Sequence, residues 1–430
     1  MLDPVLASRL QFAWTTMIHI IFPTITMGLA PFVVYIIYKE VSGAGEPWIS
    51  LRRFWVKLFA LTFVVGTVTG IVLEFEFGTN FATYASAVGG IFGGPLATEG
   101  LMAFFLESTF LGILVFGRER VSDRLYFLSA ILVGLGSWLS AVWILIANSW
   151  MQTPQGFEMG MRAGNEVAVI VDPVVAYLNP RFLWMFFHMQ MGAVLATGLF
   201  VAGIATYKLT TTEERRSFWR TSLKLAIVAM LITAPFQAVQ GDAYGRHVYQ
   251  TQPQKFAAME AVWETDTYVP EYLIAFPKDL DQFLNPRAKD LFGIGIPGGA
   301  SWLASGGDPS AEIKGLNEFE GSPPVVFVFW SFRAMVGLGF WFIFLAFWAG
   351  LRLYQGSLLE STRLKQALMA STPLGVIAIE LGWIVTEVGR QPWAIQDVLK
   401  VSEGVSPNLS SAEATLTLLG FVLGYMALFG

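Results

Sequence analysis

The sequence contains no cysteine. A chain without thiols cannot form disulfides, bind iron–sulfur clusters, ligate haem through a thiolate or attach haem at a C-x-x-C-H motif. Any metal or cofactor must therefore be held by nitrogen, oxygen or thioether ligands. Nitrogen ligands are scarce as well, because the chain has only three histidines.

Charged residues are also few: 14% of the 430 residues are charged, while 54% are hydrophobic. Soluble domains usually carry about 25% charged residues, so this composition indicates a polytopic membrane protein. The net charge of −5 comes with no basic stripe, which argues against nucleic-acid binding. The N-terminal stretch MLDPVLASRLQFAW has no basic region before its apolar run and no small-residue cleavage pattern. We therefore expect the first helix to stay in the mature protein rather than to be removed as a signal peptide.

The apolar runs predict an all-α fold, a transmembrane bundle of about nine helices with one long outer loop. A helix needs about 20 apolar residues to cross the hydrocarbon core of a bilayer. Nine stretches meet or nearly meet that length: about 12–38, 54–77, 95–117, 125–149, 182–207, 219–240, 325–350, 370–389 and 411–429. The chain then has three parts: six helices over 1–240, a loop over 241–324 and three helices over 325–430.

The charges of the connections predict the orientation. Lysine and arginine gather after the first, third, fifth and seventh spans, whereas the alternate connections hold few. By the positive-inside rule, the N-terminus lies outside and the C-terminus inside. The segment 241–324, which is polar and rich in glycine and proline, then lies outside and is too long for a simple linker.

Two of the three histidines, His19 and His188, fall within predicted spans. An imidazole in lipid surroundings is costly unless it is bonded, and both an interhelical hydrogen bond and a ligand role remain open for each. The third histidine, His247, falls in the predicted outer loop, where we expect it to be solvated.

Met335 taken alone is an ordinary packing residue. Arg333, however, lies two residues away within the same span. An intramembrane arginine needs an anionic partner, such as a carboxylate or a haem propionate. A haem ligated by histidine and methionine, with its propionates near the arginine, accounts for both residues.

Acidic residues also occur within spans. Glu99 and Glu107 are eight residues apart, about two helical turns, so they lie on similar faces at different depths. An ion pair is one explanation, and an iron ligand, a proton acceptor or a proton relay is the other. Glu387 precedes Arg390 by three residues at the end of the eighth span, a spacing that also suits a helix-end ion pair. Glu74 and Glu76, near the outer end of the second span, carry less weight, because a carboxylate near the interface can reach water.

Seven motifs together resemble subunit I of the cytochrome bd-type quinol oxidases, and the resemblance covers nearly the whole chain. The motifs are RLQFAWTTMIH, EFEFGTNF, EGLMAFFLESTFLG, ANSWMQTP, KFAAMEAVWET, FWSFRAMVGLG and GWIVTEVGRQPW. The resemblance implies a terminal respiratory oxidase of the prokaryotic cell membrane. Such an enzyme oxidises quinol at the outer face and reduces O2 to water, which generates a proton-motive force without a proton pump.

The resemblance implies three haems, two haem b and one haem d. His188 and Met335 would be the axial ligands of a low-spin haem b, with Arg333 as its electrostatic neighbour. The division of ligands between the two high-spin haems stays open at this point.

At the high-spin haems, the resemblance places His19 on the iron of haem d, with Glu99 on the other side of that haem or beside it. Glu387 would ligate the high-spin haem b, and Arg390 can meet a propionate. Trp383 of the eighth span suits packing between haems, although ordinary core packing explains it equally.

The resemblance also implies proton and quinol residues. Glu107, Ser108 and Ser140 match the positions that deliver protons to the oxygen site. Lys255 and Glu260 match the functional pair of the family's quinol-binding loop. A lysine can hold a quinol oxygen while a carboxylate accepts a proton, and an exposed amphipathic turn is the alternative.

The family implies a membrane subunit II as partner, with quinol and O2 as substrates in a lipid bilayer, and leaves a small single-span subunit open. The residues do not decide between ubiquinol and menaquinol, or between haem d and a third haem b. Two other functions stay compatible with them. One is a membrane cytochrome b that passes electrons on without reducing O2. The other is an ion or solute transporter, for which we find no inverted repeats or broken helices.

Overall fold

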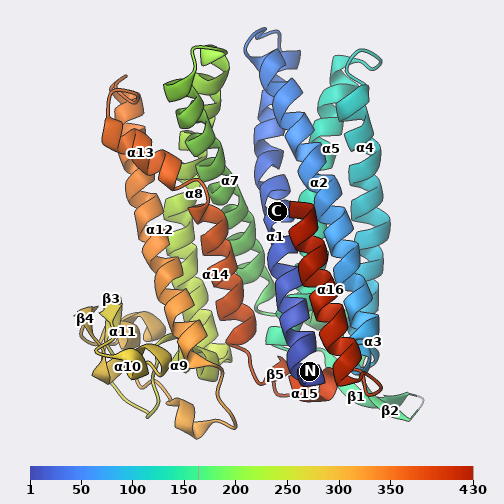
Figure 1. The fold of residues 1–430 in the computed structure, drawn as a ribbon, viewed down its shortest axis with the longest axis vertical. Coiled ribbons are helices and arrows are strands. Elements are labelled where there is room, and N and C mark those ends of the chain that lie inside the picture. Colours follow the sequence, from blue (N-terminus) through green and yellow to red (C-terminus); the bar gives the residue numbers. More distant parts are fainter. Residues whose placement is uncertain (163, 430) are drawn as a thin grey trace. The chain divides into compact units, whose positions relative to one another are not determined.

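The structure is a computed structural model that describes residues 1–162 and 164–429. It is mostly helical, so the predicted all-α membrane fold is confirmed. The chain forms two compact units. Unit 1 comprises Met1–Phe182 and Trp393–Gly430, and unit 2 comprises Leu183–Pro392. Figure 1 shows both, coloured along the sequence. The three-part division predicted from the sequence describes position relative to the membrane and stays a prediction.

Within the described residues, eight helical stretches are long and apolar enough to cross a membrane, and a ninth is formed if one bent pair counts as a single span. That pair is α13 (Thr362–Ala370) and α14 (Leu374–Val388), which meet at a bend of 41°. The predicted span 370–389 therefore differs from the structure. Helix α14 has only 15 residues, about 22 Å of helix, which is short of a bilayer core of roughly 30 Å without α13.

Long helices dominate unit 1, joined by short hairpins and one-turn helices. The helices are α1 (Pro4–Val41), α2 (Trp48–Thr79), α3 (Ala82–Thr98), η1 (Glu99–Ala103), α4 (Phe104–Phe116), α5 (Asp123–Gln152), α6 (Pro173–Tyr177), α15 (Val401–Gly404) and α16 (Ser411–Phe429). The strands form two antiparallel hairpins, β1 (Phe157–Arg162) with β2 (Asn165–Ile170) and β5 (Trp393–Ile395) with β6 (Leu399–Lys400).

Helix α1 packs against α2, α5 and α16. It begins where Asp3 accepts a hydrogen bond from the backbone N–H of Leu6 at 3.1 Å, with a proline in its first turn. Small residues let its neighbours approach closely. Ala7 of α1 and Ala414 of α16 are both completely buried in one cluster. The last helix of unit 1 in the sequence thus lies against the first.

The third span is not a uniform helix. It runs from α3 through η1 to α4, and η1 is a π-helical segment that begins at Glu99. A π-helical turn holds an extra residue and shifts the register of the side chains that follow it, and such segments are frequent at functional sites. The sequence predicted a shorter span, 95–117, because the glycine-rich start of α3 is only weakly apolar.

Four long or bent helices form the membrane part of unit 2: α7 (Phe182–Thr211), α8 (Arg216–Thr251), α12 (Val325–Tyr354) and the α13–α14 pair. Helix α12 packs on α8 and α14. Helix α7 approaches α14 so closely that a Cβ added at Gly375 would lie 2.5 Å from the Cα of Ala196. Only glycine fits there, which fixes the distance between these two helices.

The segment between α8 and α12 forms a small folded region of unit 2, seen beside the end of α12 in Figure 1. Its elements are α9 (Pro253–Met259), β3 (Glu271–Phe276), α10 (Leu280–Leu284), η2 (Ala288–Asp290), β4 (Phe292–Ile296), α11 (Gly299–Ser305) and η3 (Leu316–Glu318). Strands β3 and β4 form an antiparallel hairpin. The indole N–H of Trp330 in α12 donates to the carbonyl of Phe283 at 2.9 Å, and the two rings stack. This region is therefore attached to the membrane helices.

The prediction that His247 is solvated is wrong. Helix α8 continues to Thr251, ten residues past the predicted start of the loop, so His247 lies on its last turns. The residue is 9% exposed, and its ring stacks on Trp184 of α7 with centroids 6.3 Å apart. Charged and polar residues near the end of α8 concealed this extension, because they resemble the start of a loop.

Candidate functional site

His188 lies on α7 with its ring oriented by the neighbouring helix. Its Nδ1 is 2.5 Å from Oε1 of Gln240 in α8. The amide nitrogen of Gln240 donates to the carbonyl of Trp184 at 2.7 Å, which leaves the amide oxygen facing the imidazole. Nδ1 must therefore carry the proton and donate it, so that Nε2 keeps a lone pair for a metal. A hydrogen-bond acceptor on the ring nitrogen that does not bind the metal is typical of a metal-ligating histidine.

Glycines lie against both predicted ligands of the low-spin haem. A Cβ at Gly241 of α8 would lie 3.4 Å from Cε1 of His188. One at Gly382 of α14 would lie 3.1 Å from the sulfur of Met335 in α12. The imidazole and the thioether thus pack against positions of the neighbouring helices that have no side chain. These two donors fit a haem held by histidine and methionine.

Arg333 of α12, predicted to need an anionic partner, is paired with two carboxylates. Its guanidinium donates to Glu260, which follows α9, and to Glu271, the first residue of β3. The side chains of the three residues are 6%, 2% and 11% exposed, respectively. The predicted quinol residue Glu260 is therefore paired with Arg333, which lies two residues before the predicted ligand Met335 on α12.

Lys255, the other predicted quinol residue, lies on α9 and is 2% exposed. Its ammonium group donates to the carbonyl of Thr386 at 2.9 Å. Its side chain also passes the end of α14, where a Cβ at Gly389 would lie 3.0 Å from the Lys255 Cγ. Helix α9 and the residue after it therefore connect two of the predicted haem-ligand helices, since Glu260 pairs with α12 and Lys255 bonds to α14.

Glu387 and Arg390 form an ion pair at the end of α14, with an oxygen to Nη2 distance of 2.5 Å. The Glu387 side chain is 34% exposed, whereas that of Arg390 is 6% exposed. Within the described residues, Nε and Nη1 of Arg390 have no hydrogen-bond acceptor. Buried donors without acceptors are rare, and two of them on one guanidinium fit a carboxylate such as a haem propionate. Trp383 is half-buried on the same helix.

In unit 1, His19 of α1 has a polar partner on α2. Its Nδ1 is 2.9 Å from the hydroxyl oxygen of Thr69. That hydroxyl donates to the carbonyls of Val65 and Gly66 at 2.9 and 3.0 Å, so it must accept the proton of Nδ1. The Nε2 atom of His19 is then left as the ligand, as in His188. A Cβ at Gly70 would lie 3.1 Å from Cε1 of this imidazole, so here too the ring packs against a glycine.

The two acids of the third span meet the same helix, α5. Glu99 accepts a hydrogen bond from Ser140 at 2.7 Å. Glu107 is 5% exposed and lies against Gly136, one turn from Ser140, where a Cβ would be 2.5 Å from the Glu107 Cγ. Glu99 and Glu107 thus meet one face of α5, the face that carries Ser140. Ser108 bonds to the carbonyl of Phe105 in its own helix at 3.4 Å.

Sequence reasoning missed several polar residues of this site. Gln240 and Thr69 are uncharged, and such side chains are common enough in spans to give no signal. Glu271 lies in a loop, where an acid is unremarkable. Glu380 had a signal, because it is an acid within the eighth span, and in the described structure neither of its carboxylate oxygens has a hydrogen-bond partner. The rule applied to Glu99 and Glu107 would have found it.

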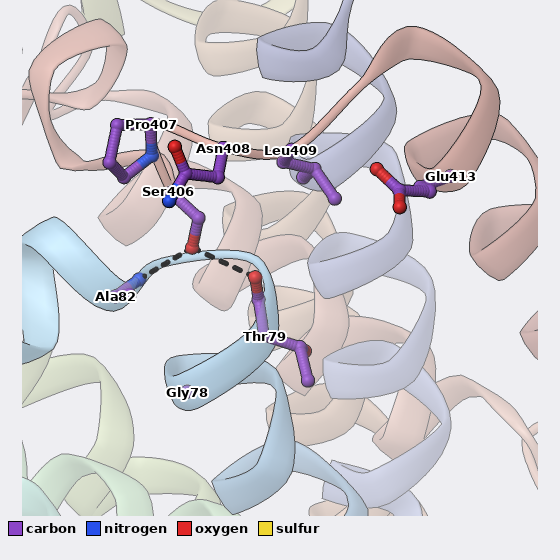
Figure 2. Close-up of a pocket in the computed structure, with 8 residues that line it drawn as sticks. All are labelled: Gly78, Thr79, Ala82, Ser406, Pro407, Asn408, Leu409 and Glu413. Atoms are coloured by element: carbon purple, nitrogen blue, oxygen red, sulfur yellow. Dashed lines mark hydrogen bonds between the residues drawn. The ribbon is translucent and has the colours of Figure 1, made fainter.

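A surface pocket of about 330 Å³ lies elsewhere in unit 1, where the end of α2 meets the connection between α15 and α16. Figure 2 shows Ser406 in this pocket, accepting a hydrogen bond from the backbone of Ala82 and donating one to the carbonyl of Thr79. The pocket is lined by Gly78, Thr79, Ala82, Ser406, Pro407, Asn408, Leu409 and Glu413, none of them a predicted site residue. These bonds attach the connection before α16 to α2.

The chain matches the family model of the cytochrome bd terminal oxidase subunit I over residues 7–430. It is 35% identical to the cytochrome bd ubiquinol oxidase subunit 1 of Bacillus subtilis, over 98% of this chain and 90% of that protein. It is 33% identical to the cytochrome bd-II ubiquinol oxidase subunit 1 of Escherichia coli, over 100% and 94%. The solved bd oxidase of Geobacillus thermodenitrificans matches with a TM-score of 0.88 and 30% identity, over 99% and 95%.

The long apolar helices, which carry imidazole, thioether and carboxylate groups, fit the class of haem-binding membrane proteins. The family match covers nearly the whole chain. The chain belongs to the cytochrome bd terminal oxidase subunit I family. It is a subunit of a multi-subunit bacterial respiratory oxidase, a quinol:oxygen oxidoreductase with haem cofactors.

Proposed function

We propose that the residues predicted from the sequence hold three haems. In unit 2, His188 and Met335 ligate a low-spin haem b, and Glu387 ligates a high-spin haem b. In unit 1, His19 ligates haem d, with Glu99 beside it. The observation that carries this proposal is the orientation of the two imidazoles, because Gln240 and Thr69 each accept the Nδ1 proton and leave Nε2 for iron.

When bound, the haems carry electrons from quinol to O2. The residues of the chain do the rest of the work. Arg390 supplies two buried N–H donors that neutralise a propionate. Glu99 and Glu107 hold protons along α5, where Ser140 bonds to the first of them. Glu107 lies deeper toward the inner side in the predicted orientation, so protons for water enter there.

At the quinol site, Lys255 binds a quinol oxygen and Glu260 accepts a quinol proton. The site faces outside, because the positive-inside rule places the segment between α8 and α12 there. Quinol protons are released outside while the protons for water come from inside, so charge crosses the membrane without a pump. A membrane subunit II completes the oxidase, and a small single-span subunit is compatible with it.

An absorption spectrum tests the haem content. We expect the purified oxidase, oxidised and then reduced with dithionite, to show a Soret band, b-type bands and a far-red band of haem d. Reduced b-type bands without the far-red band would replace haem d by a third haem b. Absence of a Soret band would reject all three haem assignments, and a colourless protein is what the transporter alternative predicts.

The Glu387→Ala variant tests the ligand on α14. The carboxylate is the proposed iron ligand, so the variant should lose the high-spin b signal and keep the low-spin spectrum. Glu360→Ala, at an exposed acid in the connection after α12, is the matched control and should leave both signals in place. An unchanged high-spin signal in Glu387→Ala would remove this assignment.

A further inference from the structure

Two carboxylates from separate loop elements converge on one guanidinium. Arg333 of α12 donates through Nη2 to Glu260 and through Nη1 to Glu271. The carboxyl groups of Glu260 and Glu271 also hydrogen-bond to each other. The sequence pointed to Glu260 and Arg333, whereas Glu271 had no predicted role.

The charges of this triad do not balance when both acids are ionised. One guanidinium and two carboxylates carry a net charge of −1, and an uncompensated charge is costly in a buried site. The three side chains are no more than 11% exposed. With one proton shared between the two carboxyl groups the triad is neutral, as in carboxyl pairs that cannot both ionise.

Among the described residues, two charged groups act on Glu271. The charged groups that face it are Glu260, after α9, and Arg333 of α12. From α11 and β4 it meets Gly299 and Ile296, and a Cβ at Gly299 would lie 2.7 Å from the Cβ of Glu271. Burial first, and then the neighbouring Glu260, raises the pKa of Glu271 to about 8, against the opposing effect of Arg333.

Of the two carboxylates, that of Glu271 is the more exposed to solvent. The Glu260 side chain is 2% exposed, and that of Glu271 is 11% exposed. A proton that arrives at Glu260 therefore has a hydrogen-bonded neighbour that lies closer to water. The triad contains both an inner acceptor and an outer donor.

We propose that Glu271 is a proton-relay residue of the quinol site, which takes the quinol proton from Glu260 and passes it to the water outside. The inference rests on the proposed quinol role of Glu260. A quinol O–H bond breaks, the proton forms an O–H bond on Glu260, and a proton leaves from Glu271 to water. The two electrons leave quinol for the haems of the oxidase and finally reduce O2, which is the enzyme's own oxidant. Each quinol sends its two protons through the pair in turn.

A different explanation of the triad is that it only attaches the loop to α12. The Glu271→Gln variant separates the two, because the amide oxygen still accepts from Arg333 but the side chain no longer titrates. If the triad is only an attachment, the Gln variant should keep the turnover and the pH profile of the wild type. If Glu271 is a relay, the Gln variant should lower kcat by about tenfold or more. Loss of a direct general base would cost more, roughly 100-fold or above.

The experiment uses the complete purified oxidase in lipid nanodiscs. Quinol-dependent O2 uptake is measured across the pH range that brackets the pKa of about 8, in wild type, Glu271→Gln and Glu271→Asp. Glu312→Gln changes an exposed acid of the same loop and is the matched control. We expect Glu271→Gln to lose kcat and the pH dependence of kcat with little change in KM and an unchanged haem spectrum. Glu271→Asp should restore part of kcat, and Glu312→Gln should resemble wild type.

Redox-linked infrared difference spectra give a readout that does not depend on turnover. The wild type should show a carbonyl band of a protonated carboxylic acid that shifts in D2O, and Glu271→Gln should lose or displace it. If Glu271→Gln does not fold, absence of this band from the wild type overturns the proposal, and its presence with partial turnover in Glu271→Asp supports it.

The outcomes also separate this inference from the proposed function. If Glu260→Gln abolishes quinol oxidation but Glu271→Gln keeps the wild-type kcat and pH profile, the relay is wrong and the quinol role of Glu260 stands. If Glu260→Gln oxidises quinol normally, both are wrong. If Glu271→Gln and Glu271→Asp lose the low-spin haem spectrum to the same extent as they lose kcat, the triad is an attachment and the relay is overturned.

Discussion

At the scale of single residues, uncharged polar side chains decide how the imidazoles within the helices face their ligand sites. Thr69 is the clearest case, because its one hydroxyl proton is directed to its own helix and its lone pairs remain for the Nδ1–H of His19. Such partners fix the tautomer and raise the basicity of the ligating nitrogen. An imidazole without its partner can rotate or change tautomer.

We predict that Thr69→Val weakens haem binding in unit 1. Valine keeps the shape of threonine but cannot accept the Nδ1 proton, and loss of such a partner costs about 10 to 100-fold in metal affinity. The haem content per protein and the far-red absorption should fall, while the low-spin spectrum stays. Thr67→Val is the matched control, because that hydroxyl donates to the Phe63 carbonyl of its own helix. Equal haem content in both variants would contradict the prediction.

At this scale the sequence predicts the charged members of the site better than their partners. His188, Arg333 and Glu107 stand out because an ionisable group in lipid is expensive. Gln240 and Glu271 give no such signal. Their partners lie 52 and 62 residues away in the chain, so only the fold brings each pair together.

At the scale of elements, the region between α8 and α12 is attached to the membrane helices through buried polar contacts. Lys255 bonds to the end of α14 and Arg333 holds β3 and the end of α9. The β3–β4 hairpin turns three apolar residues of β4 outward, since Phe292, Ile294 and Ile296 are 68%, 63% and 53% exposed. Glu271, at the start of β3, is buried and meets Arg333.

This attachment should weaken as the pH rises. The ordinary pKa of Glu271 is 4.5, and in the folded protein burial raises it to about 8. The folded loop then binds a proton more tightly than the detached loop does. This contribution to stability is complete below the ordinary pKa and is lost as the pH rises through about 8. As the pH rises from about 5 to above 8, proteases should cleave the loop of the wild type faster relative to the loop of Glu271→Gln measured at the same pH. A ratio of the two cleavage rates that does not change with pH would contradict this.

Element boundaries show what apolar run length can and cannot predict. The requirement for about 20 apolar residues locates most spans, because lipid imposes it on every helix. The π-helical start at Glu99 and the bend before α14 do not follow from run length. They depend on packing against α5 and α7, as the contacts of Gly136 and Gly375 illustrate.

At the scale of the whole molecule, the orientation in the membrane follows from the connections. The basic ones, which hold residues such as Arg118 and Lys208, should remain in the cytoplasm. We predict that a fluorescent protein fused after α16 fluoresces in cells. Alkaline phosphatase inserted at the exposed Gly307 should be active, because that enzyme requires the outer compartment. The opposite pair of results would reverse the orientation and place the quinol site inside.

Unit 1 is built from two separate segments of the chain, and this affects how the protein is made. Its helices α1 to α5 precede unit 2 in the chain, and α16 follows it. The face of α1 around Ala7 is covered by α16, and the backbone N–H of Leu2 donates to the Thr415 hydroxyl at 3.1 Å. A ribosome must therefore complete and insert all of unit 2 before unit 1 can close. Synthesis leaves one flank of the first helix open to lipid or to assembly factors until the second part of its own unit emerges.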